Sequence, residues 1–257
     1  MQPHHQLSTQ LNAYFELYNH TDFIIKDPIS IPRQFTLKQD IEIAGFIAAI
    51  LAWGNRTAIL NSCNKLMTLM DHAPFDFVMN HTAQDLKKLE CFVYRTFNTT
   101  ALYYFIAFFQ HHYSNYDSLE SAFTRVDDLE NFNMYDALIA FKNYFFSLEY
   151  APDRTKKHIA SPIKNSTCKR INMFLRWMVR KDSAIDFGIW DQIQPKDLIM
   201  PIDVHVSRVA RKLGLLEREK DDWKAAVELT HHLKQFDALD PVKYDIALFG
   251  AGVNYDL

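Results

Sequence analysis

The chain has 257 residues, of which 28 are lysine or arginine and 31 are aspartate or glutamate, so that its formal net charge is −3. Its 48% of hydrophobic residues excludes an intrinsically disordered chain and suffices for the core of one large domain or two small ones. The presence of only six glycines disfavours all-β folds, because their tight turns need positive φ. Averaged over the whole chain, the charge indicates no nucleic-acid partner.

The cysteines and the termini bear on compartment and cofactors. Cys63, Cys91 and Cys168 are widely spaced, which indicates a reducing compartment and provides no ligand set for zinc or an iron–sulfur cluster. The N-terminus lacks the basic-then-apolar pattern of a signal peptide, and the longest apolar stretch, residues 41–53, is too short to span a bilayer. We therefore expect a cytoplasmic protein with no cofactor and no membrane partner.

Apolar residues recur at helical spacing along most of the chain. A capping-box pattern at residues 36–39 begins the first predicted helix, which continues to Leu51 with Gly54 just beyond it. Asn55 can cap a second helix that runs to Met70. Further helices are predicted over residues 82–90, 99–113, 118–125, 133–148, 167–180, 222–236 and 241–251. Because we find no alternating strand pattern, we predict an all-α fold.

The average charge conceals a basic block between residues 154 and 181. This window contains no acidic residue and has a formal charge of +9, which leaves −12 for the rest of a chain whose total is −3. Such a block in an acidic protein is typical of a phosphate-binding surface, although a solvated basic face of a surface helix would give the same pattern. Its members are Arg154, Lys156, Lys157, Lys164, Lys169, Arg170, Arg176, Arg180 and Lys181.

The predicted helix over 167–180 has two faces. Its apolar residues, from Cys168 to Met178, form a core-facing stripe. Lys169, Arg176 and Arg180 are nearly superposed on the opposite face, where we expect them to meet solvent or phosphate.

Asp203 begins the next short helix, which Gly214 terminates. The dipole at the N-terminus of a helix favours an ionised carboxylate. By itself, the position of Asp203 is sufficiently explained by helix capping.

Three segments together resemble a known family. Residues 201–210, Pro-Ile-Asp-Val-His-Val-Ser-Arg-Val-Ala, are similar to the aspartate motif of the helix-hairpin-helix (HhH-GPD) DNA glycosylases. Residues 166–170 occupy the place of that family's hairpin and catalytic lysine, and residues 244–250 resemble the helix that closes its fold. Residues 154–257 also resemble a bacterial branch of the superfamily, the DUF2400 group.

The resemblance implies a two-lobed helical fold with DNA in the cleft between the lobes. One lobe would comprise residues 55–181, with the hairpin-like segment and Lys169. The other would comprise residues 1–54 and 182–257, with Asp203. Residues 182–200, where the helical period is weak, are expected to form an ordered loop or a short insertion.

The resemblance also implies base-excision chemistry on damaged DNA, for example on an oxidised purine. Lys169 would attack the sugar and form a Schiff base, and Asp203 would be the catalytic carboxylate. The other cations around Lys169 disfavour its ammonium form and so favour the nucleophilic amine. The expected DNA contacts are Lys156, Lys157, Lys164, Arg170, Arg176 and Arg180. The expected platforms for the flipped base are Trp53, Trp190 and Trp223.

The sequence departs from the family pattern in three places. The hairpin-like residues 161–166 contain no glycine where the family reads L-P-G-[V/I]-G, so the close approach of backbone amides to phosphate is in question. Lys169 and Asp203 are 34 residues apart, which is more similar to the archaeal 8-oxoguanine glycosylases than to most members. The cysteine cluster of the endonuclease III branch is absent, so no iron–sulfur cluster is implied.

Two alternatives remain open. The chain could be a DNA-binding protein on the same scaffold without catalysis, or a helical metal-dependent hydrolase that uses Asp203 and His205. Elsewhere we predict no metal site, because the adjacent pairs His111-His112 and His231-His232 point in different directions on a helix.

Overall fold

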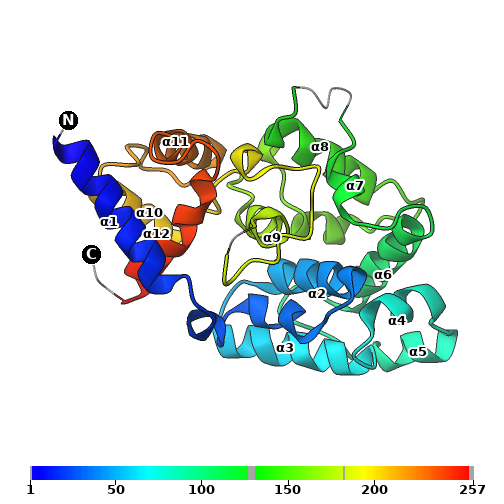
Figure 1. The fold of residues 1–257 in the computed structure, drawn as a ribbon. Coiled ribbons are helices and arrows are strands. Elements are labelled where there is room, and N and C mark those ends of the chain that lie inside the picture. The colour runs from blue at the N-terminus through cyan, green and yellow to red at the C-terminus, as the bar shows by residue number, and fades with distance from the viewer. Residues whose placement is uncertain (1, 127–130, 182, 255–257) are drawn as a thin grey trace. The chain divides into compact units, whose positions relative to one another are not determined.

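The computed structural model of the chain describes residues 2–126, 131–181 and 183–254. Within these ranges the chain forms α-helices, α1 to α12, and short 3₁₀ helices, η1 to η7, and no β-strand. The all-α prediction is therefore confirmed. Figure 1 shows the order of the helices along the chain.

The chain divides into two compact units, one of residues 25–160 and one that combines 1–24 with 161–257. These boundaries differ from the expected division into 55–181 and the remainder. Helix α2 (Lys38–Leu51) packs against α3 (Arg56–Leu69) and α4 (Pro74–Asn80) in the first unit, so residues 25–54 belong with the helices that follow them. Arg176 of α9 (Lys169–Val179) and Arg180, which follows this helix, bind aspartates in the C-terminal part of the second unit, which also contains both Lys169 and Asp203.

The unit of residues 25–160 has an aromatic core around α2. This helix is mostly apolar and, apart from its first two residues, buried, as expected for a central helix. Phe46 lies against Phe105, Phe109, Phe141 and Phe145 of α6 and α8. The elements of this unit are η2 (Pro28–Ser30), η3 (Pro32–Gln34), α2 (Lys38–Leu51), α3 (Arg56–Leu69), α4 (Pro74–Asn80), α5 (Ala83–Lys88), α6 (Thr99–Tyr113), α7 (Glu120–Phe123), α8 (Met134–Phe145) and η4 (Asp153–His158).

The caps of α2 and α3 test the predicted helix starts. The side chain of Asn55 accepts a hydrogen bond from the N–H of Ala58 at 3.1 Å, which confirms its predicted role as the cap of α3. The predicted capping box at residues 36–39 is wrong, because α2 is preceded by Leu37, whose side chain has no hydrogen-bonding group.

In the other unit, α12 is the central helix. It packs against both α1 and α10, and Figure 1 shows α1 (blue) beside α12 (red). Gly250 allows this approach, because a Cβ atom there would meet the ring of Tyr18 at 2.2 Å. The elements of this unit are α1 (Gln2–Tyr18), η1 (Thr21–Ile24), η5 (Pro162–Lys164), α9 (Lys169–Val179), η6 (Pro195–Asp197), α10 (Val204–Lys212), α11 (Trp223–Leu233), η7 (Pro241–Lys243) and α12 (Tyr244–Asn254).

Candidate active site

Two helix starts in the unit of residues 1–24 and 161–257 position Lys169 and Asp203. Cys168 has a left-handed backbone, with φ of 52°, and turns the chain so that Lys169 is the first residue of α9. Asp203 caps α10, where its Oδ1 atom accepts hydrogen bonds from the N–H groups of His205 at 3.0 Å and Val206 at 3.1 Å. The cap fixes this carboxylate and leaves Oδ2 for another partner.

That partner is Lys169. Its Nζ atom lies 3.7 Å from Oδ2 of Asp203, and the two side chains are 26% and 24% exposed. Nζ also lies 3.2 Å from the sulfur of Met173. The structure thus brings together the two residues that the sequence motif singled out, at a place that is open enough for a solute to reach.

A second carboxylate, that of Asp245 of α12, lies in the same unit. Its side chain is 9% exposed and accepts a hydrogen bond from Nη1 of Arg176 at 2.5 Å. Burial raises the pKa of Asp245 to about 6; the cations Arg176 and Lys169 oppose this shift, and the anions Asp203 and Asp186 add to it.

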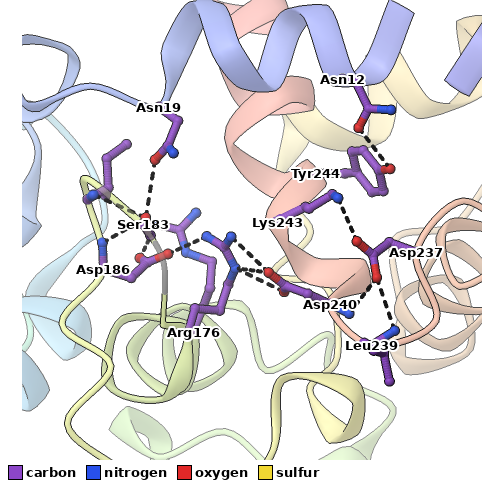
Figure 2. A network of polar contacts seen from close by, with 12 residues as sticks. Asn12, Asn19, Arg176, Ser183, Asp186, Asp237, Leu239, Asp240, Lys243 and Tyr244 are labelled. Atoms are coloured by element: carbon purple, nitrogen blue, oxygen red, sulfur yellow. Dashed lines mark hydrogen bonds and ion pairs between the residues drawn. The ribbon is translucent and has the colours of Figure 1, made fainter. Parts of the chain in front are cut away.

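Arg176 and Arg180 are not on a solvent-facing surface, which corrects their predicted role as DNA contacts. Nη2 of Arg176 lies 3.2 Å from Asp186, while Arg180 binds Asp186 at 2.6 Å and Asp240 at 2.9 Å. Both guanidinium groups are buried, because these carboxylates compensate the cost of removing them from water. Figure 2 shows part of this network, with Arg176, Asp186 and Asp240 labelled.

The other cations of the basic block fall into both units. Lys156 and Lys157 are exposed residues of the unit 25–160, and Lys156 forms an ion pair with Asp153 at 2.8 Å. Lys164 is exposed and Arg170 half-buried in the other unit, where desolvation lowers the pKa of Arg170. Because Arg176 and Arg180 are buried and paired with carboxylates, the block of +9 along the sequence is not an exposed surface of +9.

The three tryptophans occupy different environments. Trp190 is fully buried with its ring edge-on to Phe174, and Trp223 is buried at the start of α11. Both are core residues without an open face, which corrects their predicted role as base platforms. Trp53 lies in the unit 25–160, half-buried, with the guanidinium carbon of Arg95 4.4 Å from its ring centroid.

The hairpin-like segment makes its turn without glycine. Asn165 has φ of 55°, a left-handed conformation that asparagine tolerates better than most residues. Its side-chain amide donates to Asp222 at 3.0 Å, and its carbonyl accepts a hydrogen bond from the N–H of Trp223 at 3.2 Å. The segment is thereby tied to the start of α11.

A cavity of about 750 Å³ lies near the C-terminal end of α9 and not at Lys169. Ten helical steps separate Lys169 from Val179, a distance of about 15 Å along the axis. Three of the cations that line the cavity already bind carboxylates, since Arg180 pairs with Asp240, Lys181 with Asp191 and Lys243 with Asp237. Despite its size, the cavity is therefore not a better candidate active site than the pair of Lys169 and Asp203.

The histidines follow the prediction that adjacent residues face different ways. His112 is buried against the carbonyl of Ser118 while His111 is exposed, and Nδ1 of His232 contacts the carbonyl of Leu215 while His231 is exposed. His205 lies edge-on to Phe249. Over residues 2–126, 131–181 and 183–254, no group of three or more histidine, cysteine, aspartate or glutamate side chains is placed to hold a metal ion.

A comparison with protein families gives a match over most of the chain. The family described as a protein of unknown function, DUF2400, matches residues 27–254. The chain belongs to the DUF2400 family. Comparisons of this DUF2400 chain with curated proteins and with solved structures give no match. None of its described helices has the length and apolar character needed to cross a bilayer.

Sequence reasoning missed the carboxylates that bind the arginines of α9 in this DUF2400 protein. Asp186, Asp240 and Asp245 lie 6 to 69 residues from their arginine partners, too far for any local pattern. One signal was present in the sequence. The carboxylates of the chain lie outside the basic block, where the formal charge is −12, and three of them bind the buried arginines Arg176 and Arg180.

Proposed function

We propose that this DUF2400 protein is a DNA glycosylase with abasic-site lyase activity that removes a damaged base, such as an oxidised purine. The observation that carries the proposal is the pairing of Lys169 Nζ with Asp203 Oδ2 at 3.7 Å in a partly exposed site. The similarity of residues 201–210 and 166–170 to the motifs of helix-hairpin-helix glycosylases supports it.

The first step is a proton transfer from the Lys169 ammonium to the Asp203 carboxylate. The amine lone pair then forms a bond to C1′ of the sugar as the glycosidic bond breaks, and the base leaves with the bonding electrons. A proton from the attached nitrogen neutralises the base. Asp203 holds the proton of Lys169 during this substitution, so that the nitrogen stays available as a nucleophile.

Opening of the sugar ring completes the Schiff base. The C1′–O4′ bond breaks, Asp203 returns its proton to O4′, and C1′ becomes doubly bonded to the nitrogen of Lys169. Of the three ammonium protons, one is then on the base, one on O4′ and one on the iminium nitrogen. Loss of a C2′ proton and of the 3′ phosphate from this iminium cleaves the strand by β-elimination.

The capped geometry suits Asp203 to this role. Two backbone N–H groups hold Oδ1, so the carboxylate keeps its orientation when Oδ2 gains or loses a proton. The exposed cations Lys157 and Lys164 and the half-buried Arg170 remain candidates for phosphate contacts in the two units. Trp53 remains a candidate platform for a base in the unit 25–160.

Borohydride trapping on duplexes that contain 8-oxoguanine or an abasic site tests the proposal, because reduction converts the Schiff base into a stable crosslink. We expect trapping by the wild type and its loss, by more than about a hundredfold, in Lys169→Gln. Lys212→Gln is the matched control, since it makes the same change at an exposed lysine on α10.

Two results would contradict the proposal. Trapping by Lys169→Gln at the wild-type level would exclude Lys169 as the nucleophile. Salt-dependent binding of the wild type to DNA without a trapped product would instead identify a DNA-binding protein that lacks this catalysis.

A further inference from the structure

The cavity of about 750 Å³ beside the C-terminal end of α9 is formed entirely by the unit of residues 1–24 and 161–257. Its lining comes from Phe15 of α1, from residues 179–181, from residues 190–196 and from residues 237–243. Sites that bind small organic molecules have volumes of about 300–1,000 Å³, so the cavity is large enough for such a ligand. The side chains of the lining determine which class of molecule would fit.

Part of the lining is apolar and open to solvent. Leu239 is 73% exposed. Phe15 is half-buried, and the guanidinium carbon of Arg180 and Nζ of Lys243 lie 5.6 Å and 6.0 Å from its ring centroid. The exposed surface of Leu239 is unfavourable in water until an apolar group covers it. An aromatic ligand suits this part of the lining, because a ring can contact both Leu239 and the ring of Phe15.

The two carboxylates of the lining are already bound. Asp240 accepts hydrogen bonds from Nε of Arg180 at 3.0 Å and 2.9 Å. Figure 2 shows Asp237, which binds Nζ of Lys243 at 2.5 Å and the N–H groups of Leu239 and Asp240 at 3.0 Å each. Because both carboxylates are paired with cations, they do not favour a cationic ligand.

Two lysines of the lining provide positive charge for a ligand. Lys196 is exposed and has no ion pair among the residues that the structure describes. Lys181 pairs with Asp191, but these side chains are 55% and 77% exposed, and exposed pairs contribute so little stability that a ligand can replace Asp191. Hydrogen bonds between Gln194 and Asp197 fix the backbone of η6, which contains Lys196. The cavity is therefore prepared for an anionic group.

We propose that this cavity is a binding site for an aromatic anion, a molecule with a flat apolar body and one sulfonate, carboxylate or phosphate group. Lys196 and Lys181 bind the anionic group, and Phe15 and Leu239 contact the apolar body. The inference goes beyond the function proposed above and does not depend on it, because it involves neither DNA nor the amine of Lys169.

Two fluorescent dyes that differ in one charged group test the inference. The first, 8-anilinonaphthalene-1-sulfonate, has an aromatic body and a sulfonate, and the second, N-phenyl-1-naphthylamine, has the same body without the sulfonate. We expect the wild type to bind one molecule of the anionic dye per chain. Lys196→Gln should weaken that binding about tenfold, because it removes a charge-assisted hydrogen bond. The neutral dye should bind the wild type and Lys196→Gln with equal affinity.

Lys212→Gln is the matched control, since it makes the same change at an exposed lysine of α10 that does not line the cavity. It should bind both dyes with the affinity of the wild type, as should Lys169→Gln. Leu239→Ala should weaken the binding of both dyes about fivefold, because both lose the same apolar contact. Since Leu239 is exposed, this variant should keep the thermal unfolding curve of the wild type.

The outcomes separate this inference from the proposed function. Absence of binding by the anionic dye, or equal affinity for it in the wild type and Lys196→Gln, overturns the inference. An equal loss of affinity for both dyes in Lys196→Gln also overturns it, because the lysine would then have a structural role. So does a Leu239→Ala variant that binds both dyes as the wild type does. Failure of the wild type to trap DNA contradicts the proposed function and leaves the dye binding unchanged.

Discussion

The two units bury charged groups in opposite ways. In the unit 25–160, the carboxylate of Glu42 lies inside an aromatic core and accepts hydrogen bonds from the hydroxyls of Tyr113 and Ser118 and the N–H of Leu119. In the other unit, the buried carboxylates of Asp186 and Asp245 bind arginine side chains. The first arrangement uses neutral donors and the second uses ion pairs.

The difference bears on function. Buried ion pairs contribute little net stability, because the desolvation of both partners offsets their attraction. The ionic network lies in the unit that contains Lys169 and Asp203, and it holds the helix α9, which Lys169 begins, against α12. We therefore interpret the network as the support of that helix, whereas the hydrogen bonds of Glu42 serve the packing of α2.

Removal of one arginine should have the largest effect on stability. Arg180→Met leaves Asp240 without this buried partner and Asp186 with Arg176, and we expect a loss of about 3–5 kcal/mol in the free energy of unfolding. Phe141→Ala in the aromatic core should cost a similar amount, about 3–5 kcal/mol, through the cavity that it creates. Urea unfolding measures both.

A second substitution should recover part of the free energy of unfolding that Arg180→Met loses, whereas the loss in Phe141→Ala comes from a cavity and has no such remedy. Asp240→Asn added to Arg180→Met removes an unpaired charge and should restore part of the lost stability. If Arg180→Met alone lowers the free energy of unfolding by less than about 1 kcal/mol, the ion pairs of Arg180 behave as exposed pairs and not as buried ones.

The next prediction concerns pH, to which the two units should respond with opposite signs. Burial lowers the pKa of His112 to about 4, and the nearby cations Arg125 and His111 add to this, against the hydrogen bond to Ser118. The unfolded state then binds more protons, so the stabilisation present above about pH 6.5 is lost as the pH falls towards 4.

For Asp245 the folded state binds more protons than the unfolded state between about pH 4 and 6, because the pKa of its carboxyl is raised. The unit that contains it should gain stability as the pH falls through this window. Each effect is limited to about 3 kcal/mol. Hydrogen exchange, read separately for the two units at pH 7 and pH 5, measures the pair of trends. Two results would contradict the assignment of these trends to His112 and Asp245. One is an equal slope of stability against pH in both units. The other is a slope that persists in His112→Gln or in Asp245→Asn.

The sequence predicted local features well and long-range pairing poorly. The caps Asn55 and Asp203 were visible because a cap and its helix are adjacent in sequence. Arg176 and Arg180 were placed on a solvent-facing stripe because helical periodicity reports the angle of a side chain but not what covers it. Their partner aspartates come from other segments, and only the fold brings them together.

The charge of the basic block shows the same limit. A count along the chain gives +9 between residues 154 and 181, but Arg176, Arg180 and Lys169 each meet carboxylates from outside that window. Trp190 was misjudged for a related reason, since composition cannot distinguish a core indole from a base platform. The pairing of Lys169 with Asp203 was anticipated by the family motif and not by physical pattern alone.

The smallest stability effect and the sharpest functional contrast should come from two helix caps, one in each unit. Asp203→Asn keeps a side-chain oxygen that can cap α10, and it removes only a partly exposed ion pair, so it should cost less than about 1 kcal/mol. Asn55→Ala removes the cap of α3 and should cost about 1 kcal/mol. On stability alone, the cap of α3 should therefore matter at least as much as that of α10.

Trapping should rank the two variants in the reverse order. Asn55→Ala should retain the wild-type rate, whereas Asp203→Asn should lose at least about a hundredfold, because its amide cannot accept the proton of Lys169. Thermal unfolding and trapping on the same preparations give both rankings. If Asp203→Asn is as active as wild type, capping is a sufficient role for Asp203, and the carboxylate has no part in the chemistry.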